Sequence, residues 1–207
     1  MIEPLTAATD IVVAAGGATF AVRIVRVTAD KAARLVAGSL AAASFGALAG
    51  AAYHMARTSA MWKVSAIPVG VAGYLFGLAI ALAYFSARGR RVAQIVLLVQ
   101  LLVYAICVVL SDNFAIVIAD YASVMLAILL VCLLHWSDAP ARWIAAGVAI
   151  SFFAAGVQIS SVRIGPLNHN DIYHLIELGG LYCWYRGGRR LTVRATPGAP
   201  TSSPSDQ

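Results

Sequence analysis

The densest group of reactive side chains in this chain lies near its C-terminal end, where the last apolar segment begins. The histidines and carboxylates within residues 168–177 are His169, Asp171, His174 and Glu177. Ionisable groups within a membrane span are costly unless they are buried in protein, paired or bound to an ion, so they mark a candidate functional site. Zn²⁺ binds histidine nitrogen and carboxylate oxygen and can activate water for hydrolysis, so these residue types favour that chemistry.

The spacing of these side chains fits one face of a helix. At 100° per residue, Asp171, His174 and Glu177 share a face of a helix that begins near Asn168. His169 and His174 are five positions apart, so both can reach one ion only if His169 lies in a non-helical first turn. Asn168 is a suitable N-cap and Asp171 falls near the third helical position, so helix capping is the simpler interpretation of these two.

The composition indicates a membrane protein. The chain has 207 residues, of which 61% are hydrophobic and 12% are charged, and its mean hydropathy is +0.83. Soluble domains are usually about 25% charged. The cysteines, Cys107, Cys132 and Cys183, lie in separate apolar segments without metal-type spacing, so we interpret them as packing residues.

The helices that must position the reactive residues are visible as apolar stretches. A helix needs about 20 mostly apolar residues to cross a bilayer. The sequence therefore predicts an all-α polytopic membrane protein, a compact bundle of about seven transmembrane helices. Residues 1–194 are predicted to form one domain, and residues 195–207, rich in Pro, Ser and Thr, to be a disordered tail. The approximate spans are Thr9–Ile24, Ala33–His54, Val64–Phe85, Val92–Leu110, Phe114–Trp136, Trp143–Ile159 and Asn170–Tyr185.

The distribution of Lys and Arg predicts the orientation of these spans. Basic residues are retained on the cytoplasmic side of a membrane. Twelve of the fifteen fall on one side, so we predict an outside N-terminus and a cytoplasmic C-terminus. The other side has only Arg57, Lys63 and Arg163. The twelve are Arg23, Arg26, Lys31, Arg34, Arg88, Arg90, Arg91, Arg142, Arg186, Arg189, Arg190 and Arg194.

This orientation places several polar residues in the outer half of the bundle. His54 ends the second predicted span, and Asp10 lies near the start of the first. Asp120 lies about 10 Å inside the outer end of the fifth span, at 1.5 Å per residue. Gln158 lies near the outer end of the sixth span, whereas His135 falls at the inner end of the fifth. The sequence therefore predicts one polar layer with His135 outside it.

Each of these residues also has a simpler interpretation. His54 is a boundary residue that an interfacial position would explain, and His169 fits a solvated loop equally well. Glu177 and Asp120 lie several residues inside apolar spans, where a structural pairing, for example with His174, competes with a catalytic role.

The residues near the ends of the second and seventh spans resemble a known family. Seven spans, an outside N-terminus, a late His in span two and an early His motif in span seven resemble the CREST superfamily, which includes alkaline ceramidases. In those proteins three His hold a Zn ion that activates water, so the resemblance implies hydrolysis of lipid amides. His54 matches the span-two ligand, and His174 matches the second His of a span-seven pair. The chain departs from the pattern at Asn170, Gly50 and Ser65, where the family has His, Ser and Asp. Asp171, Asp120 and Asp10 are the candidates to replace the missing Asp.

The functional prediction follows from the residues and the resemblance together. We predict a metal-dependent hydrolase of lipid amides or esters in a bacterial inner membrane, with the bilayer and a lipid substrate as partners. The placement of the basic residues fits membrane topology rather than nucleic-acid binding. A non-catalytic subunit or sensor is the main alternative, and a transporter is less favoured because no internal repeat is present. The predicted zinc ligands are His54, His169 and His174, and the predicted catalytic residues are Asp171, Asp120 and Glu177.

Overall fold

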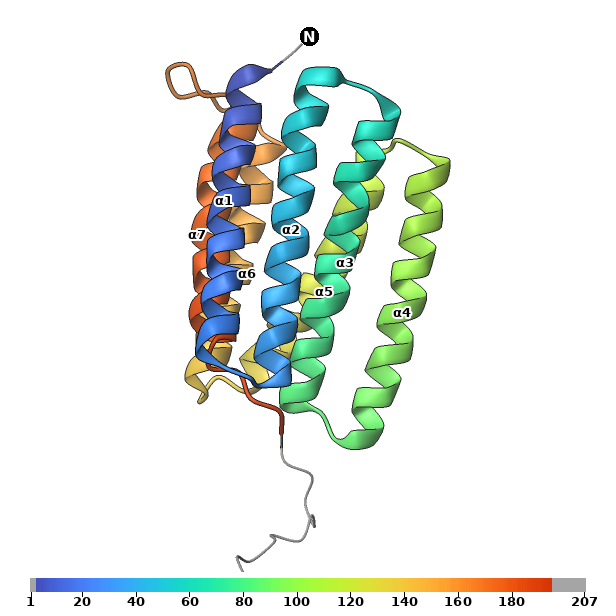
Figure 1. The fold of residues 1–207 in the computed structure, drawn as a ribbon, viewed down its shortest axis with the longest axis vertical. Helices are drawn as coiled ribbons and strands as arrows, with labels where there is room; N and C mark the ends of the chain where they lie inside the picture. Colours follow the sequence, from blue (N-terminus) through green and yellow to red (C-terminus); the bar gives the residue numbers. More distant parts are fainter. Residues whose placement is uncertain (1–2, 195–207) are drawn as a thin grey trace, which may run out of the picture.

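Within residues 3–194 the chain forms seven α-helices, of which only α6 and α7 are joined by a link longer than four residues (Figure 1). The structure, a computed structural model, describes residues 3–194, so the tail predicted at residues 195–207 lies outside the described residues. The prediction of an all-α chain is confirmed. The helices are α1 (Pro4–Val27), α2 (Lys31–Ala56), α3 (Ser59–Tyr84), α4 (Ala87–Leu110), α5 (Phe114–Leu134), α6 (Ala139–Gln158) and α7 (His169–Gly188).

Helices α1 to α6 are long and apolar enough to cross a membrane, so the chain is a membrane protein. Helix α7 is the exception, because Asp171, His174 and Glu177 lower the apolar character of its first half. Helix α1 begins at Pro4, earlier than the predicted Thr9, since proline fits the first turn of a helix where no backbone donor is needed.

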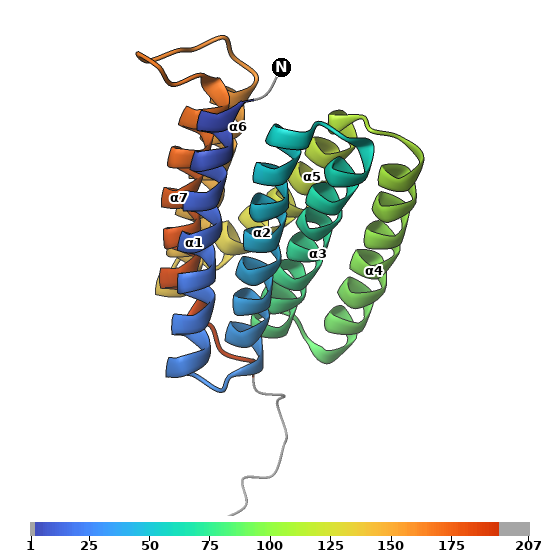
Figure 2. The same ribbon diagram turned by 45° about the horizontal axis from the view of Figure 1, so that its top comes forward.

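The helices form a closed ring with one helix outside it. Around the ring, α1 packs against α2, α2 against α3, α3 against α5, α5 against α6, α6 against α7, and α7 against α1. Helix α4 lies at the edge of the bundle beside α3, as Figures 1 and 2 show from two directions. The α2–α3, α4–α5 and α6–α7 links lie at the same end of the bundle as the start of α1 (Figure 1).

Helices α6 and α7 meet through small residues. At Gly147 of α6, an added Cβ would collide with the indole of Trp184 and lie 2.9 Å from the carbonyl oxygen of Gly180 on α7. Small residues at such positions allow membrane helices to approach closely, and van der Waals packing then holds them together. This contact fixes α7, and hence its polar face, against α6.

We therefore expect Gly147→Ala to lower the thermal unfolding temperature of the detergent-solubilised protein. Trp184 is 4% exposed and packs edge-on against Phe76, so it has little room to move away from a new methyl group. Overpacking of this kind typically costs about 1–3 kcal/mol.

Gly156→Ala is the matched control on the same helix. No atom lies within 4 Å of a Cβ built at Gly156. Alanine is also the better helix former, by about 1 kcal/mol. Equal unfolding temperatures for the two variants would contradict the close α6–α7 contact.

Candidate functional site

A cavity of about 510 Å³ lies among the ring helices. All six ring helices contribute to its lining, which is mainly apolar. Its principal ionisable groups are Asp10 from α1, His54 from α2, and His174 and Glu177 from α7. Mostly apolar cavities of 300–1,000 Å³ with a few converging polar groups are typical of ligand sites.

The carboxylate of Asp10 is the point at which the two histidines meet. His174 Nε2 lies 3.1 Å from Asp10 Oδ1, and His54 Nε2 lies 3.7 Å from Asp10 Oδ2. Asp10 and His174 are buried, at 5% and 8% exposed. Helices α1, α2 and α7 thus bring one carboxylate and two imidazole nitrogens together.

The other ring nitrogen of each histidine is held by an acceptor. His54 Nδ1 lies 2.8 Å from a carboxylate oxygen of Glu3, so it carries the proton and donates. His174 Nδ1 lies 2.9 Å from Thr9 Oγ1, and the Thr9 hydroxyl donates its own proton to the Thr6 carbonyl oxygen at 2.9 Å. Thr9 Oγ1 therefore accepts from His174. Each neutral imidazole consequently has its proton on Nδ1 and its lone pair on Nε2.

These tautomers leave three electron-rich groups facing one another. Both Nε2 lone pairs point toward Asp10, and Asp10 Oδ2 has no hydrogen-bond partner among residues 3–194. A buried carboxylate without a partner is costly, so the arrangement requires positive charge between these groups, supplied by protons or by a metal ion. Gly50 leaves room for this carboxylate, because a Cβ there would lie 3.1 Å from Asp10 Oδ2.

Glu177 adds a second carboxylate to the cavity. It is 8% exposed and lies almost one turn beyond His174 on α7. Its Oε1 accepts hydrogen bonds from Ser151 Oγ at 3.0 Å and from the Tyr121 hydroxyl at 3.5 Å. Its Oε2 has no partner in the described part of the chain. Glu177 therefore has one oxygen fixed and one available for proton transfer.

Comparison with known proteins gives one match. A family model, DUF6962, described as a family of unknown function, matches residues 5–193. The chain belongs to this family. No curated protein and no solved structure matches it. Because the matched region contains Asp10, His54, His174 and Glu177, the whole cavity site falls within the DUF6962 region.

The other predicted site residues of this DUF6962 chain lie elsewhere. Asp171 is fully buried but does not line the cavity. It accepts from Thr6 Oγ1 at 2.7 Å and from the Asn168 backbone N–H at 2.8 Å, while Asn168 caps the first turn of α7 in return. Asp171 therefore forms a capping box and ties α7 to α1, as the capping interpretation expects.

His169 and Asp120 are also separate from the cavity. His169 is the first residue of α7, half-buried, and neither residue lines the cavity. Asp120 faces α4, where its Oδ1 accepts from Gln100 Nε2 at 3.1 Å. His135, at the opposite end of the bundle, bonds to the carbonyl oxygen of Val131. Of the predicted site residues, His54, His174 and Glu177 thus line one cavity, whereas His169 does not. Asp10 lies in the cavity where a third metal ligand is needed.

The Asp10 carboxylate and the Nε2 atoms of His54 and His174 are of the types that zinc binds, but they are not already placed as a metal site. No group of three or more His, Cys, Asp or Glu side chains within residues 3–194 is already arranged to hold a metal ion. The ligand atoms of a tetrahedral zinc site lie about 3.3 Å apart, because each lies about 2.0–2.1 Å from the ion. The distance from His174 Nε2 to Asp10 Oδ1, 3.1 Å, is slightly shorter than this value, and that from His54 Nε2 to Asp10 Oδ2, 3.7 Å, is slightly longer.

Proposed function

We propose that the chain is a membrane metallohydrolase that cleaves an amide or ester bond in a lipid. In this proposal Asp10, His54 and His174 hold a divalent cation, most suitably zinc. The main support for the proposal is that the Nε2 atoms of both histidines lie beside the Asp10 carboxylate inside a mainly apolar cavity. Two histidines and one carboxylate form a ligand set used by catalytic zinc sites, which keep an open position for water.

The surroundings of the two histidines support a metal-ligand role. Metal-binding histidines usually donate their second N–H to a carboxylate, carbonyl or other acceptor, which fixes the ring and its tautomer. Glu3 does this for His54, and is itself held by Arg57 at 2.7 Å. Thr9 does it for His174. The rings are therefore oriented before any ion binds.

The remaining groups of the cavity support hydrolysis. A divalent cation in this position would polarise a substrate carbonyl and make water a stronger nucleophile near neutral pH. Glu177 is suited to accept a proton from the attacking water and to return it to the leaving amine or alcohol, because its Oε2 is unpaired. The apolar lining suits an acyl chain and would exclude bulk water.

We also propose that the site lies in the outer half of a bacterial inner membrane, with α7 as a seventh span. Twelve of the fifteen basic residues lie at the bundle end where α7 ends, which supports a cytoplasmic location for that end. A tag placed after Gln207 should be protected from impermeant reagents in intact cells. Labelling of that tag without permeabilisation would reverse the orientation.

His174→Ala should remove bound metal and abolish hydrolysis. His174 supplies the ligand atom nearest to Asp10, and losing a ligand or its support commonly costs about 10- to 100-fold or more in metal affinity or activity. The metal content of the purified protein checks this directly. His135→Ala is the control, because His135 directly follows the last residue of α5 and does not line the cavity. Equal metal content in both variants would favour a partner-binding subunit or sensor.

A further inference from the structure

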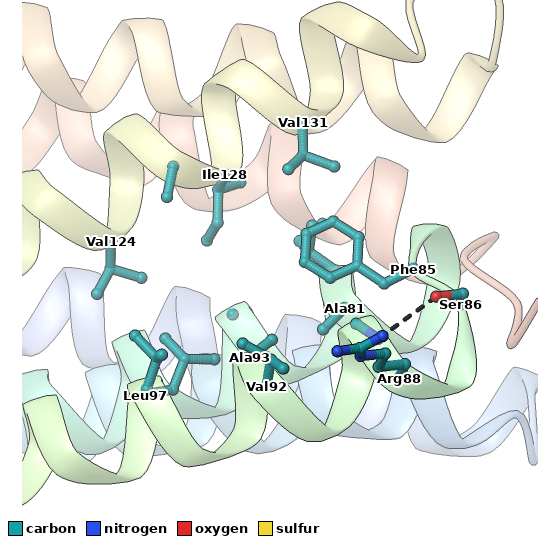
Figure 3. Close-up of a pocket in the computed structure, with 15 residues that line it drawn as sticks. Ala81, Phe85, Ser86, Arg88, Val92, Ala93, Leu97, Val124, Ile128 and Val131 are labelled. Atoms are coloured by element: carbon teal, nitrogen blue, oxygen red, sulfur yellow. Dashed lines mark hydrogen bonds between the residues drawn. The ribbon is translucent and has the colours of Figure 1, made fainter.

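A second cavity lies between α3, α4 and α5, toward the bundle end at which α3 and α5 end and α4 begins (Figure 3). Its volume is about 540 Å³. The side chains around it are apolar apart from Ser86 and Arg88, both near the start of α4. Figure 3 shows Phe85 and Ile128 among this apolar lining, with Arg88 beside Ser86 at one end.

The cavity exists because α4 stands away from α5 in this half of the bundle. The buried residues of α4 are Tyr104 and Val108, both in its other half. Near the cavity, Val92 and Val96 are 55% and 58% exposed. The gap between α4 and α5 therefore opens toward the lipid rather than into the ring, and it is separate from the site around Asp10.

Arg88 supplies an unpaired cation at this apolar cavity. It has no hydrogen-bond or ion-pair partner among residues 3–194, whereas neighbouring Arg90 donates to the carbonyl oxygens of Phe85 and Arg194. At this end, the carboxylates in the described part of the chain are Asp30, which caps α2, and Asp138. The region is therefore strongly basic, and neither of these carboxylates forms an ion pair with Arg88.

We propose that this cavity binds an anionic phospholipid of the surrounding leaflet. One acyl chain fills the space between α4 and α5, and the phosphate of the headgroup pairs with the Arg88 guanidinium. An apolar cavity that opens to lipid and carries a single free cation at headgroup depth matches both parts of such a molecule. The bound lipid would hold α4 against α5, where protein side chains leave a gap.

Native mass spectrometry of the delipidated protein, titrated with phosphatidylglycerol or phosphatidylcholine, tests this proposal. We expect the wild-type chain to retain one phosphatidylglycerol in preference to phosphatidylcholine. Arg88→Gln should weaken phosphatidylglycerol binding about fivefold, the usual effect of one basic residue near an anionic membrane surface. Ala127→Phe, which fills the cavity from α5, should reduce the binding of both lipids.

Arg91→Gln is the matched control, because Arg91 lies one turn further along α4 and does not line the cavity. It should bind phosphatidylglycerol as the wild-type chain does. Equal weakening by Arg88→Gln and Arg91→Gln would mean that only diffuse charge attracts the lipid. Unchanged binding in Arg88→Gln, or no preference over phosphatidylcholine, would overturn the proposal. These outcomes are independent of zinc, so they leave the hydrolase proposal to its own tests.

Discussion

Asp10→Asn is expected to lower the affinity of the protein for zinc by more than about 100-fold and to abolish hydrolysis. The substitution keeps the size of the side chain but removes the negative charge on which His54 and His174 converge. An amide nitrogen facing the Nε2 lone pairs would also donate a hydrogen bond to them and occupy them. Competition with a chelator of known affinity measures the change.

Asp120→Asn is the matched control for this change. Asp120 is also a carboxylate inside an apolar helix, but it bonds to Gln100 and lies outside the cavity. Its substitution should leave zinc affinity and hydrolysis unchanged. If both variants lost zinc equally, the loss would reflect damage to the fold. If Asp10→Asn kept wild-type affinity, the ligand assignment would be wrong.

Glu177→Gln is expected to reduce kcat by about 10²- to 10⁴-fold, the usual contribution of a general acid or base. The variant keeps the shape of the side chain and an oxygen that can accept from Ser151, but it cannot carry a proton. Zinc content should stay at the wild-type level, because Glu177 is not one of the proposed ligands.

Two measurements on the same preparation separate the possible roles of Glu177. Turnover of a short-chain lipid amide or ester reports proton transfer, and metal content reports the ligand site. Loss of zinc together with activity would make Glu177 a structural or ligand residue. Full activity in the variant would exclude Glu177 as the proton carrier.

The helices could be predicted well from the sequence because a bilayer imposes a length and an apolar composition on each span. The residues at which the helices begin and end were harder to predict. The additional turn at the start of α1 follows from Pro4, and it matters because it carries Thr6, which bonds to Asp171 on α7. The polar first half of α7 was visible in the sequence, and capping by Asn168 could be read from local spacing.

The central role of Asp10 could not be predicted in the same way. The sequence places Asp10 in the outer polar layer, but its pairing with His54 and His174 depends on how α1 packs between α2 and α7. Such long-range contacts have no signature in local spacing. Asp120 was predicted as a site residue because it lies several residues inside an apolar span. In the structure its side chain faces α4 instead of the cavity.

Gly50 gives a physical reason for one departure from the ceramidase-like pattern. The resemblance places a Ser at this position. In this chain a Cβ at residue 50 would lie 3.1 Å from Asp10 Oδ2, so a larger side chain would compete with the carboxylate for space. The absence of a side chain at Gly50 therefore leaves space for the Asp10 carboxylate.

X-ray absorption at the zinc edge, on protein extracted gently and loaded with one equivalent of zinc, tests directly whether the histidines of the cavity bind the ion. We expect one bound zinc per chain with two imidazole nitrogens and oxygen ligands at about 2.0–2.1 Å. We also expect the imidazole signal to be reduced in His174→Ala. A spectrum of hydrated zinc alone, together with no rise in thermal unfolding temperature on adding zinc, would contradict the metal site and with it the proposed hydrolysis.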